Sequence, residues 1–462
     1  MGRAMEDVFE EVNQDSSDKD IERIGLKEKL SYGSGDFAFQ LTWSLTTAFL
    51  LYFYTDVALV PVAATGTIFL VARILSGAYN PIMGAILDRT TSKHGKARPY
   101  FLYMAIPYGI LCVLTFSAFD MSDGLKIAYA WVTFLLFGIL FASMNSPYTS
   151  LLPMMTRDPN NKVTLSSFRT VGMAIGAIVV NALTNPFIAW AGQGDEKLGF
   201  RLVSIVYALI GIACMYLIFV NCKERYSKPV TKETRTKFWE DFKLAFKNKP
   251  WVILFVFVMF NLMRVGIVTS ITVYFALNVL QNPTMIPILL TMFSIGTLTA
   301  GFIAPTIFKK LSYRAGITMV LSGSIAGYCI LPFFQDQMLS FLVIYMIIQI
   351  LAFIPTPAMF AMIADTIDYS EWKFNRRMEG FLSSTMSLGT TVGSAIGVAI
   401  VGYSLTIIGY IPGQITDSVV NGLQTLYYAG PISIMIIQIV IIYFYNLDKK
   451  QHEVIVQEIR NR

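Results

Sequence analysis

The feature that most constrains this chain is an alternation in the polar gaps between long apolar stretches, because every second gap is basic. We count about twelve apolar stretches of ~20 residues, each long enough to cross a hydrocarbon layer of ~30 Å as a helix. Loops rich in Lys and Arg remain on the cytoplasmic side, so the alternation predicts that both termini are cytoplasmic. The predicted spans are residues 33–55, 62–87, 99–119, 127–152, 164–191, 199–221, 250–278, 285–307, 315–335, 338–364, 380–410 and 422–446.

The charges outside the predicted spans support this orientation. The basic gaps contain Arg89, Lys93, Lys96 and Arg98; Arg157 and Lys162; nine Lys and Arg from Lys223 to Lys249; Lys309, Lys310 and Arg314; and Lys373, Arg376 and Arg377. The intervening gaps contain only Lys126, Lys197 and Arg201. Only 14% of the chain is charged, against roughly 25% in soluble domains. Pattern and composition together indicate a multi-pass protein of the cell membrane.

Composition also bounds the partners and the chemistry. Attraction to anionic lipid headgroups explains the net charge of +6 better than nucleic-acid binding does. His94 and His452 fall in polar segments, so they cannot build an intramembrane metal site, and the 4 scattered cysteines are read as packing residues. The patterns GxxxxGK[ST], HExxH, GxSxG and CxxC are absent, which argues against an ATP-driven pump and against an enzyme. No cofactor is expected apart from a possible coupling ion, H⁺ or Na⁺.

The longest polar gap divides the predicted spans into two groups of six. The predicted organisation is a cytoplasmic tail (1–30), a six-helix bundle (31–222), a cytoplasmic loop (223–249), a second six-helix bundle (250–447) and a cytoplasmic tail (448–462). The loop carries an amphipathic run suited to a membrane surface, formed by Phe238, Trp239, Phe242, Ala245 and Phe246. An all-α protein of two six-helix bundles is the layout of secondary transporters that hold substrate between their halves.

Polar residues inside the spans are the candidate functional residues, because a charge in hydrocarbon costs at least ~2.5–3.5 kcal/mol. In the first span Asp36, Gln40, Trp43 and Thr47 share one helix face. A carboxylate, an amide and an indole on one face suit a hydroxyl-rich ligand such as a sugar. The alternative reading is that Asp36 caps the cytoplasmic end of the helix or pairs with a loop cation.

Three arginines are predicted to be intramembrane cations. Arg73 lies near the middle of the second span, either as a structural partner of a carboxylate on a neighbouring helix or as a ligand contact. Arg169 and Arg264 have three candidate partners, which are Asp36, carbonyls freed at Pro147, and the substrate.

Polar groups also gather in the fourth, tenth and eleventh spans. In the fourth, Asn145 and Thr149 lie one turn apart around Pro147, whose freed carbonyl is tolerable only inside a bundle or beside a cavity. The tenth span has Pro355 and Pro357 on either side of Thr356. The eleventh span carries Ser383, Ser384, Ser387, Thr390 and Thr391, and for such small residues helix packing is the competing explanation.

These residues belong to a series of motifs that resembles the glycoside–pentoside–hexuronide:cation symporters of the major facilitator superfamily. The resemblance covers Lys29 to about Tyr445. Its markers are Lys29-Leu-Ser-Tyr-Gly-Ser-Gly-Asp36, Tyr52-Phe-Tyr-Thr-Asp56, Gly66-Thr-Ile-Phe-Leu-Val-Ala-Arg73, Asn80-Pro-Ile-Met-Gly84, Asp88-Arg89 with Gly95-Lys-Ala-Arg-Pro99, Asn145-Ser-Pro-Tyr148, and Ala364-Asp-Thr-Ile-Asp-Tyr-Ser-Glu371. The resemblance implies alternating access, in which two bundles rock about a central sugar site with a co-transported cation.

The chain departs from the family where the family binds its cation. Ser76 and Asn80 stand in place of two aspartates of the second span, and Thr391 stands in place of a lysine. Hard cations prefer anionic oxygen ligands, so the exchange predicts loss of the family's usual Na⁺ coupling. In the sugar site Asn145 and Arg169 match substrate-contacting positions, whereas Gln40, Thr149 and Thr356 replace an aspartate and two tryptophans of the best-known member.

The residues are accordingly predicted to form three groups. The central cavity is predicted to contain Asp36, Gln40, Asn145, Thr149, Arg169, Ser387 and Thr391. The altered coupling region is predicted to contain Asp56, Arg73, Ser76 and Asn80. Cytoplasmic gating contacts are predicted for Asp88, Arg89, Lys96, Arg98, Asp365 and Glu371.

The predicted activity is transport of a small sugar or glycoside, as a cation symporter (H⁺ in preference to Na⁺) or as a facilitator. Two alternatives remain at this stage: a lipid or amphiphile transporter on the same scaffold, and a sugar sensor that binds without transport. The sequence does not determine the oligomeric state, and a monomer would suffice.

The prediction about coupling can be tested in proteoliposomes. Counterflow of labelled sugar should not need a Na⁺ gradient, because Ser76 and Asn80 offer no anionic ligand. Counterflow is to be measured with and without Na⁺ and pH gradients. Sugar accumulation that requires Na⁺ and survives Asp36→Asn would contradict the prediction.

Overall fold

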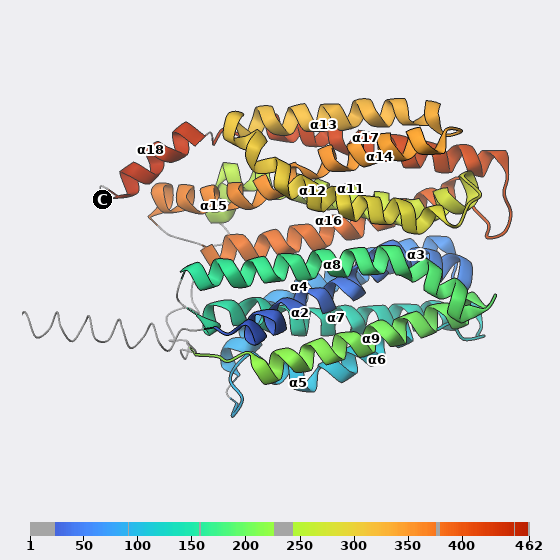
Figure 1. The fold of residues 1–462 in the computed structure, drawn as a ribbon, viewed down its shortest axis with the longest axis horizontal. Helices are drawn as coiled ribbons and strands as arrows, with labels where there is room; N and C mark the ends of the chain where they lie inside the picture. Colours follow the sequence, from blue (N-terminus) through green and yellow to red (C-terminus); the bar gives the residue numbers. More distant parts are fainter. Residues whose placement is uncertain are drawn as a thin grey trace, which may run out of the picture.

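The protein is helical throughout the residues that the computed structural model describes, which are 24–90, 92–156, 159–225, 244–375, 379–447 and 449–460. The helices form two bundles that lie side by side along their length (Figure 1). We call the end that carries Leu26 and the last helix the tail end, and the opposite end, which carries Leu59 and Gln281, the far end. Residues 1–23 of the predicted tail 1–30, and residues 238–242 of the predicted amphipathic run, lie outside the described residues.

The first bundle contains the helices of the N-terminal half. They are α2 (Leu26–Ala48), α3 (Leu50–Tyr52), the π-helical turn η1 (Phe53–Val57), α4 (Val62–Arg89), α5 (Arg98–Tyr103), α6 (Ala105–Thr115), α7 (Asp123–Met155), α8 (Pro159–Gly192) and α9 (Glu196–Asn221). The second bundle contains α11 (Lys249–Tyr274), η3 (Phe275–Val279), α12 (Met285–Lys310), α13 (Tyr313–Ile330), η4 (Leu331–Phe334), α14 (Met338–Phe353), α15 (Pro355–Phe374), α16 (Glu379–Ile407) and α17 (Asp417–Tyr443).

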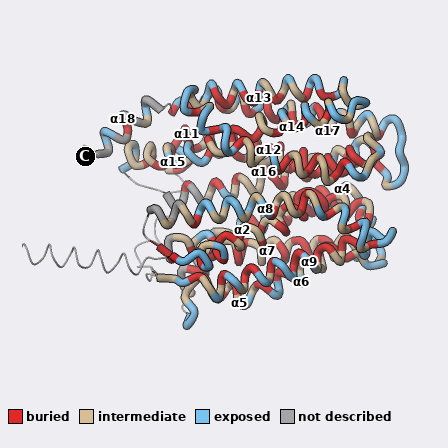
Figure 2. The backbone as a smooth tube through the Cα atoms, viewed as in Figure 1, coloured by how far each residue is buried: buried red, intermediate tan, exposed pale blue. Residues whose placement is uncertain are grey.

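These elements make twelve spans. In the described residues 10 helices are long and apolar enough to cross a membrane, and α2 and the pair α5–α6 supply the other two. Figure 2 shows exposed residues along the outer helix α13 and in the far-end loops, and buried residues where helices pack together. The fold is therefore the predicted pair of six-helix bundles.

Several helix boundaries differ from the predicted ones for local reasons. The tenth span continues to Phe374, ten residues beyond the predicted end, and it is broken at Ile354, next to the proline that begins α15. The third span is broken at Met104, between α5 and α6. The C-terminal segment, predicted only as a tail, contains α18 (Lys449–Arg460), which packs on α15.

Glycines bring the same pair of helices together in each bundle. A Cβ added to Gly172 of α8 would lie 2.2 Å from the carbonyl oxygen of Gly33 in α2. In the second bundle, a Cβ added to Gly397 of α16 would lie 2.2 Å from the carbonyl oxygen of Met263 in α11. In each half, the first span packs against the fifth span in the same way: α2 against α8, and α11 against α16. This is an internal structural repeat, which the sequence shows only weakly.

Several hydrogen bonds join the two bundles in their far halves. Asn181 of α8 donates to Ser294 Oγ of α12 at 2.8 Å, and the hydroxyls of Thr67 in α4 and Tyr403 in α16 are 2.8 Å apart. Ser270 of α11 donates to the carbonyl oxygen of Thr47 in α2 at 3.0 Å. The two bundles are therefore joined by hydrogen bonds in their far halves.

The close approach at Gly172 gives a stability prediction. Gly172→Ala should destabilise the protein by about 1–3 kcal/mol, because the new methyl group collides with backbone that cannot move independently. Gly211→Ala in α9 is the matched control, since nothing lies within 4 Å of its added Cβ. Thermal unfolding in detergent should show a lower Tm only for Gly172→Ala, and equal Tm values would contradict the packing described here.

Candidate functional site

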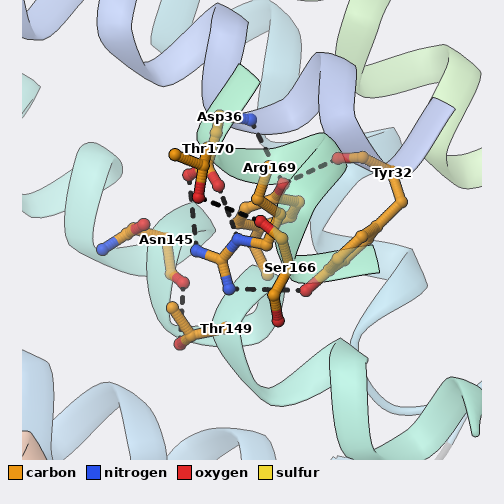
Figure 3. A network of polar contacts seen from close by, with 8 residues as sticks. Tyr32, Asp36, Asn145, Thr149, Ser166, Arg169 and Thr170 are labelled. Atoms are coloured by element: carbon orange, nitrogen blue, oxygen red, sulfur yellow. Dashed lines mark hydrogen bonds and ion pairs between the residues drawn. The ribbon is translucent and has the colours of Figure 1, made fainter. Parts of the chain in front are cut away.

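An ion pair between α2 and α8 forms the centre of the candidate site. Arg169 Nε donates to Asp36 Oδ2 at 2.5 Å, and Arg169 Nη2 donates to Asp36 Oδ1 at 3.3 Å (Figure 3). The two side chains are 23% and 17% exposed, so a ligand could reach the pair although the protein encloses most of it. The structure thus confirms Asp36 as the partner of Arg169 and not as a helix-end cap.

Two tyrosines frame this pair. Tyr148 of α7 donates to the carbonyl oxygen of Tyr32 at 2.6 Å and accepts from the backbone N–H of Asp36 at 3.2 Å. The guanidinium carbon of Arg169 lies 4.6 Å from the centroid of the Tyr148 ring, within cation–π range. The tyrosines therefore hold both members of the pair in place. The pair then needs little rearrangement when a ligand binds.

Polar side chains of α7 and α8 lie near the pair. Figure 3 shows Asn145 and Thr149 of α7 and Ser166 and Thr170 of α8 next to Arg169. Thr149, Ser166 and Thr170 are exposed although they lie in spans. They lie within one or two turns of the tail-end limits of the predicted spans, where exposed hydroxyls suit a water-filled opening better than lipid. The cluster offers carboxylate, guanidinium, amide and hydroxyl groups to a single ligand.

The other predicted cavity residues lie farther along the same surfaces. Gln40 is one turn after Asp36, packs against Gly176 of α8 and donates to Ser44 Oγ at 2.8 Å. In the second bundle Ser387 is exposed and Thr391 lies against α4, where its Cγ2 would be 3.5 Å from a Cβ added to Gly77. Of the predicted cavity group, Asp36, Arg169, Asn145 and Thr149 are the members that the structure brings together.

Arg73 has no carboxylate partner among the described residues, so one of its two predicted roles is wrong. Its guanidinium lies over the indole of Trp43, 4.3 Å from the centroid, and donates to the hydroxyls of Thr46 and Thr47 at 3.2 and 3.4 Å. Because Arg73 is only 6% exposed, direct contact with a ligand is also restricted. The aromatic face and the two hydroxyls take the place of a counter-charge.

The two neutral residues of the coupling region turn toward their own helix. Ser76 Oγ donates to the carbonyl oxygen of Arg73 at 3.0 Å, and Asn80 Nδ2 donates to the carbonyl oxygen of Gly77 at 3.3 Å. Ser76 is buried and packs against Gly138 of α7. Asp56 lies elsewhere, in η1 at the far end. Ser76 is 14 residues after the start of α4, which corresponds to roughly 21 Å of helix between Ser76 and the far end.

Arg264 is not paired with any of its predicted protein partners. It is fully buried in the second bundle, where Nη2 donates to the carbonyl oxygen of Ala352 at 3.0 Å. Its guanidinium also lies 4.9 Å from the centroid of the Phe353 ring. That carbonyl stands at the break between α14 and α15, so Arg264 holds the broken tenth span in place instead of reaching Asp36 or Pro147.

The predicted gating residues lie at the tail end, and the contacts described for them stay within one bundle. The side chains of Asp88 and Arg89 lie outside the described residues. Arg98 donates to the carbonyl oxygen of Phe219 at 2.6 Å, and the backbone N–H groups of Lys96 and Arg98 donate to Glu224 at 2.7 and 3.0 Å. Asp365 lies 3.6 Å from His452 of α18, and Glu371 follows it on α15. Gating by these residues remains a prediction.

The sequence predicted Asp56 as part of the coupling region, but it did not identify the far-end residues that contact Asp56. Tyr410 donates to Asp56 Oδ1 at 2.5 Å, and the hydroxyls of Thr55 and Tyr274 are 2.7 Å apart. Asp56 and Tyr410 are separated by 354 residues, so no local pattern signals their contact. The sequence signals were that Asp56 is a carboxylate at the edge of a span and that it ends the marker Tyr52-Phe-Tyr-Thr-Asp56.

The fold defines a multi-pass membrane protein, and the polar cluster on one helical bundle is its candidate ligand site. The chain belongs to the family described as MFS/sugar transport protein, which matches residues 31–449. This family consists of membrane transporters and not of enzymes.

Individual relatives agree with this assignment. The isoprimeverose transporter of Lactiplantibacillus pentosus is 31% identical over 433 residues, which are 92% of this chain and 90% of that one. The inner membrane symporter YicJ of Escherichia coli (strain K12) is 30% identical over 394 residues, or 84% of each chain. A solved D-xylose–proton symporter has the same fold with a TM-score of 0.65 at 13% identity, covering 92% of this chain and 98% of that one.

The ion pair gives a testable prediction. Asp36→Asn should destabilise the protein because it leaves Arg169 enclosed without a counter-charge; the cost should fall below the ~3–5 kcal/mol of a fully buried pair, since water reaches this one. The double variant Asp36→Asn/Arg169→Gln should be closer to the wild type than the single variant. A double-mutant cycle of Tm values measures the coupling between the two residues.

The exposed pair of Asp120 and Lys197 is the control, because Asp120 is 95% exposed. Asp120→Asn should leave the Tm unchanged. Additive effects of the two changes at Asp36 and Arg169 would show that their contact contributes nothing.

Proposed function

We propose that this protein moves a sugar or glycoside across the cell membrane by alternating access, with the Asp36–Arg169 pair as its central binding group. The observation that carries the proposal is the cluster of Asp36, Arg169, Asn145 and Thr149 on adjoining helices. A sugar hydroxyl both donates and accepts, and this cluster supplies acceptors and donors within reach of one ring. Membership of the sugar-transport family and the names of its relatives support the same substrate class.

The site favours neutral substrates over uronides. Arg169 already has Asp36 as its counter-charge, and Arg73 is covered by the Trp43 ring. A substrate carboxylate would have to displace Asp36 or remain unpaired, and either costs free energy in a site that the protein mostly encloses. Hydroxyl groups can join the pair without separating it.

The proposed orientation places the tail end in the cytoplasm, because the basic gaps lie there. The bundles are latched to one another near the far end through pairs such as Asn181–Ser294 and Thr67–Tyr403. The structure then corresponds to the state closed to the outside. Transport would require these far-end contacts to break while the tail ends of the bundles approach.

Proton coupling or uniport fits the site better than sodium coupling. Ser76 and Asn80 hydrogen-bond to their own helix, and neither brings a negative charge to a cation. The first span retains two intramembrane carboxylates, Asp36 and Asp56. Asp36 is paired with Arg169, so Asp56 is the one without an arginine partner among the described residues.

The proposal predicts a pattern of substrates and variants. Purified protein in liposomes should catalyse counterflow of neutral pentosides or hexosides, and uronides should compete poorly. Asn145→Ala should reduce counterflow by about tenfold or more, because losing a hydrogen bond to a substrate costs about 1.4 kcal/mol or more in an enclosed site.

The control for this variant is Ser433→Ala. Ser433 is exposed on α17, donates to the carbonyl oxygen of Ala429 and lies outside the cluster. Counterflow should not change in this variant. Failure of the wild-type protein to exchange any sugar would overturn the proposed function, and equal activity of Asn145→Ala would overturn the site.

A further inference from the structure

The far end contains a carboxylate that shares hydrogen bonds with both bundles. Asp56 Oδ1 accepts from Tyr410 at 2.5 Å, and Asp56 Oδ2 lies 2.6 Å from the hydroxyl of Thr55. Tyr410 belongs to the segment between α16 and α17, in the second bundle. Thr55 in turn contacts Tyr274 of α11 at 2.7 Å. Asp56 therefore lies on the seam that closes the far end.

No cation faces Asp56 among the described residues. The titratable groups around it are Tyr52 of α3, Glu196 of α9, Tyr274 of α11 and Tyr410. Glu196 accepts from Tyr52 at 3.0 Å and has the same charge sign as an ionised Asp56. Asp120, also at the far end, differs because Lys197 lies 2.9 Å away and lowers the pKa of its carboxyl.

Closing the far end over an ionised Asp56 is costly for this reason. Asp56 is only partly exposed in this closed arrangement, so its carboxylate loses part of its water and gains hydroxyl donors but no counter-charge. A poorly hydrated charge without a counter-charge is unfavourable in a folded protein. Taking up one proton removes the charge. The cost of closure then falls to that of an ordinary buried polar group with hydrogen bonds.

The hydrogen bonds around Asp56 accommodate the protonated form. A neutral carboxyl can donate from Oδ2 to Thr55 and still accept from Tyr410 at Oδ1. The single hydroxyl proton of Thr55 then goes to the carbonyl oxygen of Leu51, 3.1 Å away. Every group in the cluster keeps a partner in this arrangement.

We propose that Asp56 is a proton-binding site linked to far-end closure: a proton taken from the far side neutralises its carboxylate and lets the bundles close around it. This inference rests on the proposed alternating access and assigns its proton-linked step to Asp56, leaving Asp36 as a fixed charge of the sugar site. By linkage, a proton bound more tightly in the closed state stabilises that state at low pH, and the stabilisation is lost as pH rises.

The inference can be tested without any sugar. Ser270 is buried at the bundle interface, so a cysteine introduced as Ser270→Cys reacts with a membrane-impermeant maleimide only when the far end opens. Four native cysteines are replaced first. At neutral pH, adding Asp56→Asn should slow labelling several-fold, because the amide resembles the neutral carboxyl. Asp120→Asn is the matched control and should leave the labelling rate unchanged.

Transport provides the second measurement. Wild-type counterflow should fall as the pH of both sides rises, and Asp56→Asn should abolish this dependence, whereas Asp56→Glu should restore it. If Asp56→Asn does not fold, Tyr410→Phe takes its place: it keeps the carboxylate but removes one closure contact, so Ser270→Cys should label faster and the pH dependence should remain.

Two results would overturn the inference: unchanged labelling in Asp56→Asn, or an unchanged pH profile of its counterflow. With Tyr410→Phe in its place, unchanged labelling or loss of the pH dependence would overturn it as well. Absence of counterflow in the wild type would instead refute the proposed function, while the labelling experiment would still decide the role of Asp56.

Discussion

The structure depends on one constraint, which is that no charge or backbone polar group in a hydrocarbon layer can remain without a partner. Each arginine of the spans satisfies it differently. Arg169 has the carboxylate of Asp36, Arg73 has the Trp43 ring with two threonine hydroxyls, and Arg264 has a carbonyl at a helix break. Only the first of these pairs is within reach of a ligand and carries groups of both signs. The location of the candidate site follows from that difference.

The spans were predictable from sequence because a bilayer imposes length and apolar composition on each helix independently of the others. The partner of Arg169 was predictable for a similar reason, since Asp36 was the one carboxylate within the predicted spans. The partner of Arg73 was not. The chain keeps Arg73 although Ser76 and Asn80 replace the neighbouring aspartates, and a lone arginine in a span suggests a carboxylate on another helix as its partner. The structure instead places Arg73 over the indole of Trp43 on α2, about 30 residues away in sequence.

Contacts between the bundles were beyond sequence reasoning for a different physical reason. Asp56 and Tyr410 meet only after two separately packed bundles dock, and docking depends on the summed shape of the helices and not on any local signal. The predicted gating residues at the tail end have the same difficulty. Their charges indicate that the bundles can meet there, but they do not indicate in which conformational state of the protein the bundles do so. The repeated glycine contacts at Gly172 and Gly397 show that each bundle is built by one packing rule before docking.

The two carboxylates of the first span have opposite electrostatic surroundings, which suit them to different roles in transport. Asp36 is bound to a guanidinium and framed by Tyr148, so its charge is stabilised in place and stays constant while a sugar enters and leaves. Asp56 is surrounded by hydroxyls and by Glu196, so its charge is costly whenever water is excluded. The proton-linked step proposed above needs one group whose charge depends on conformation. Asp56 suits that step, because Tyr410, which donates to it when the far end is closed, belongs to the other bundle.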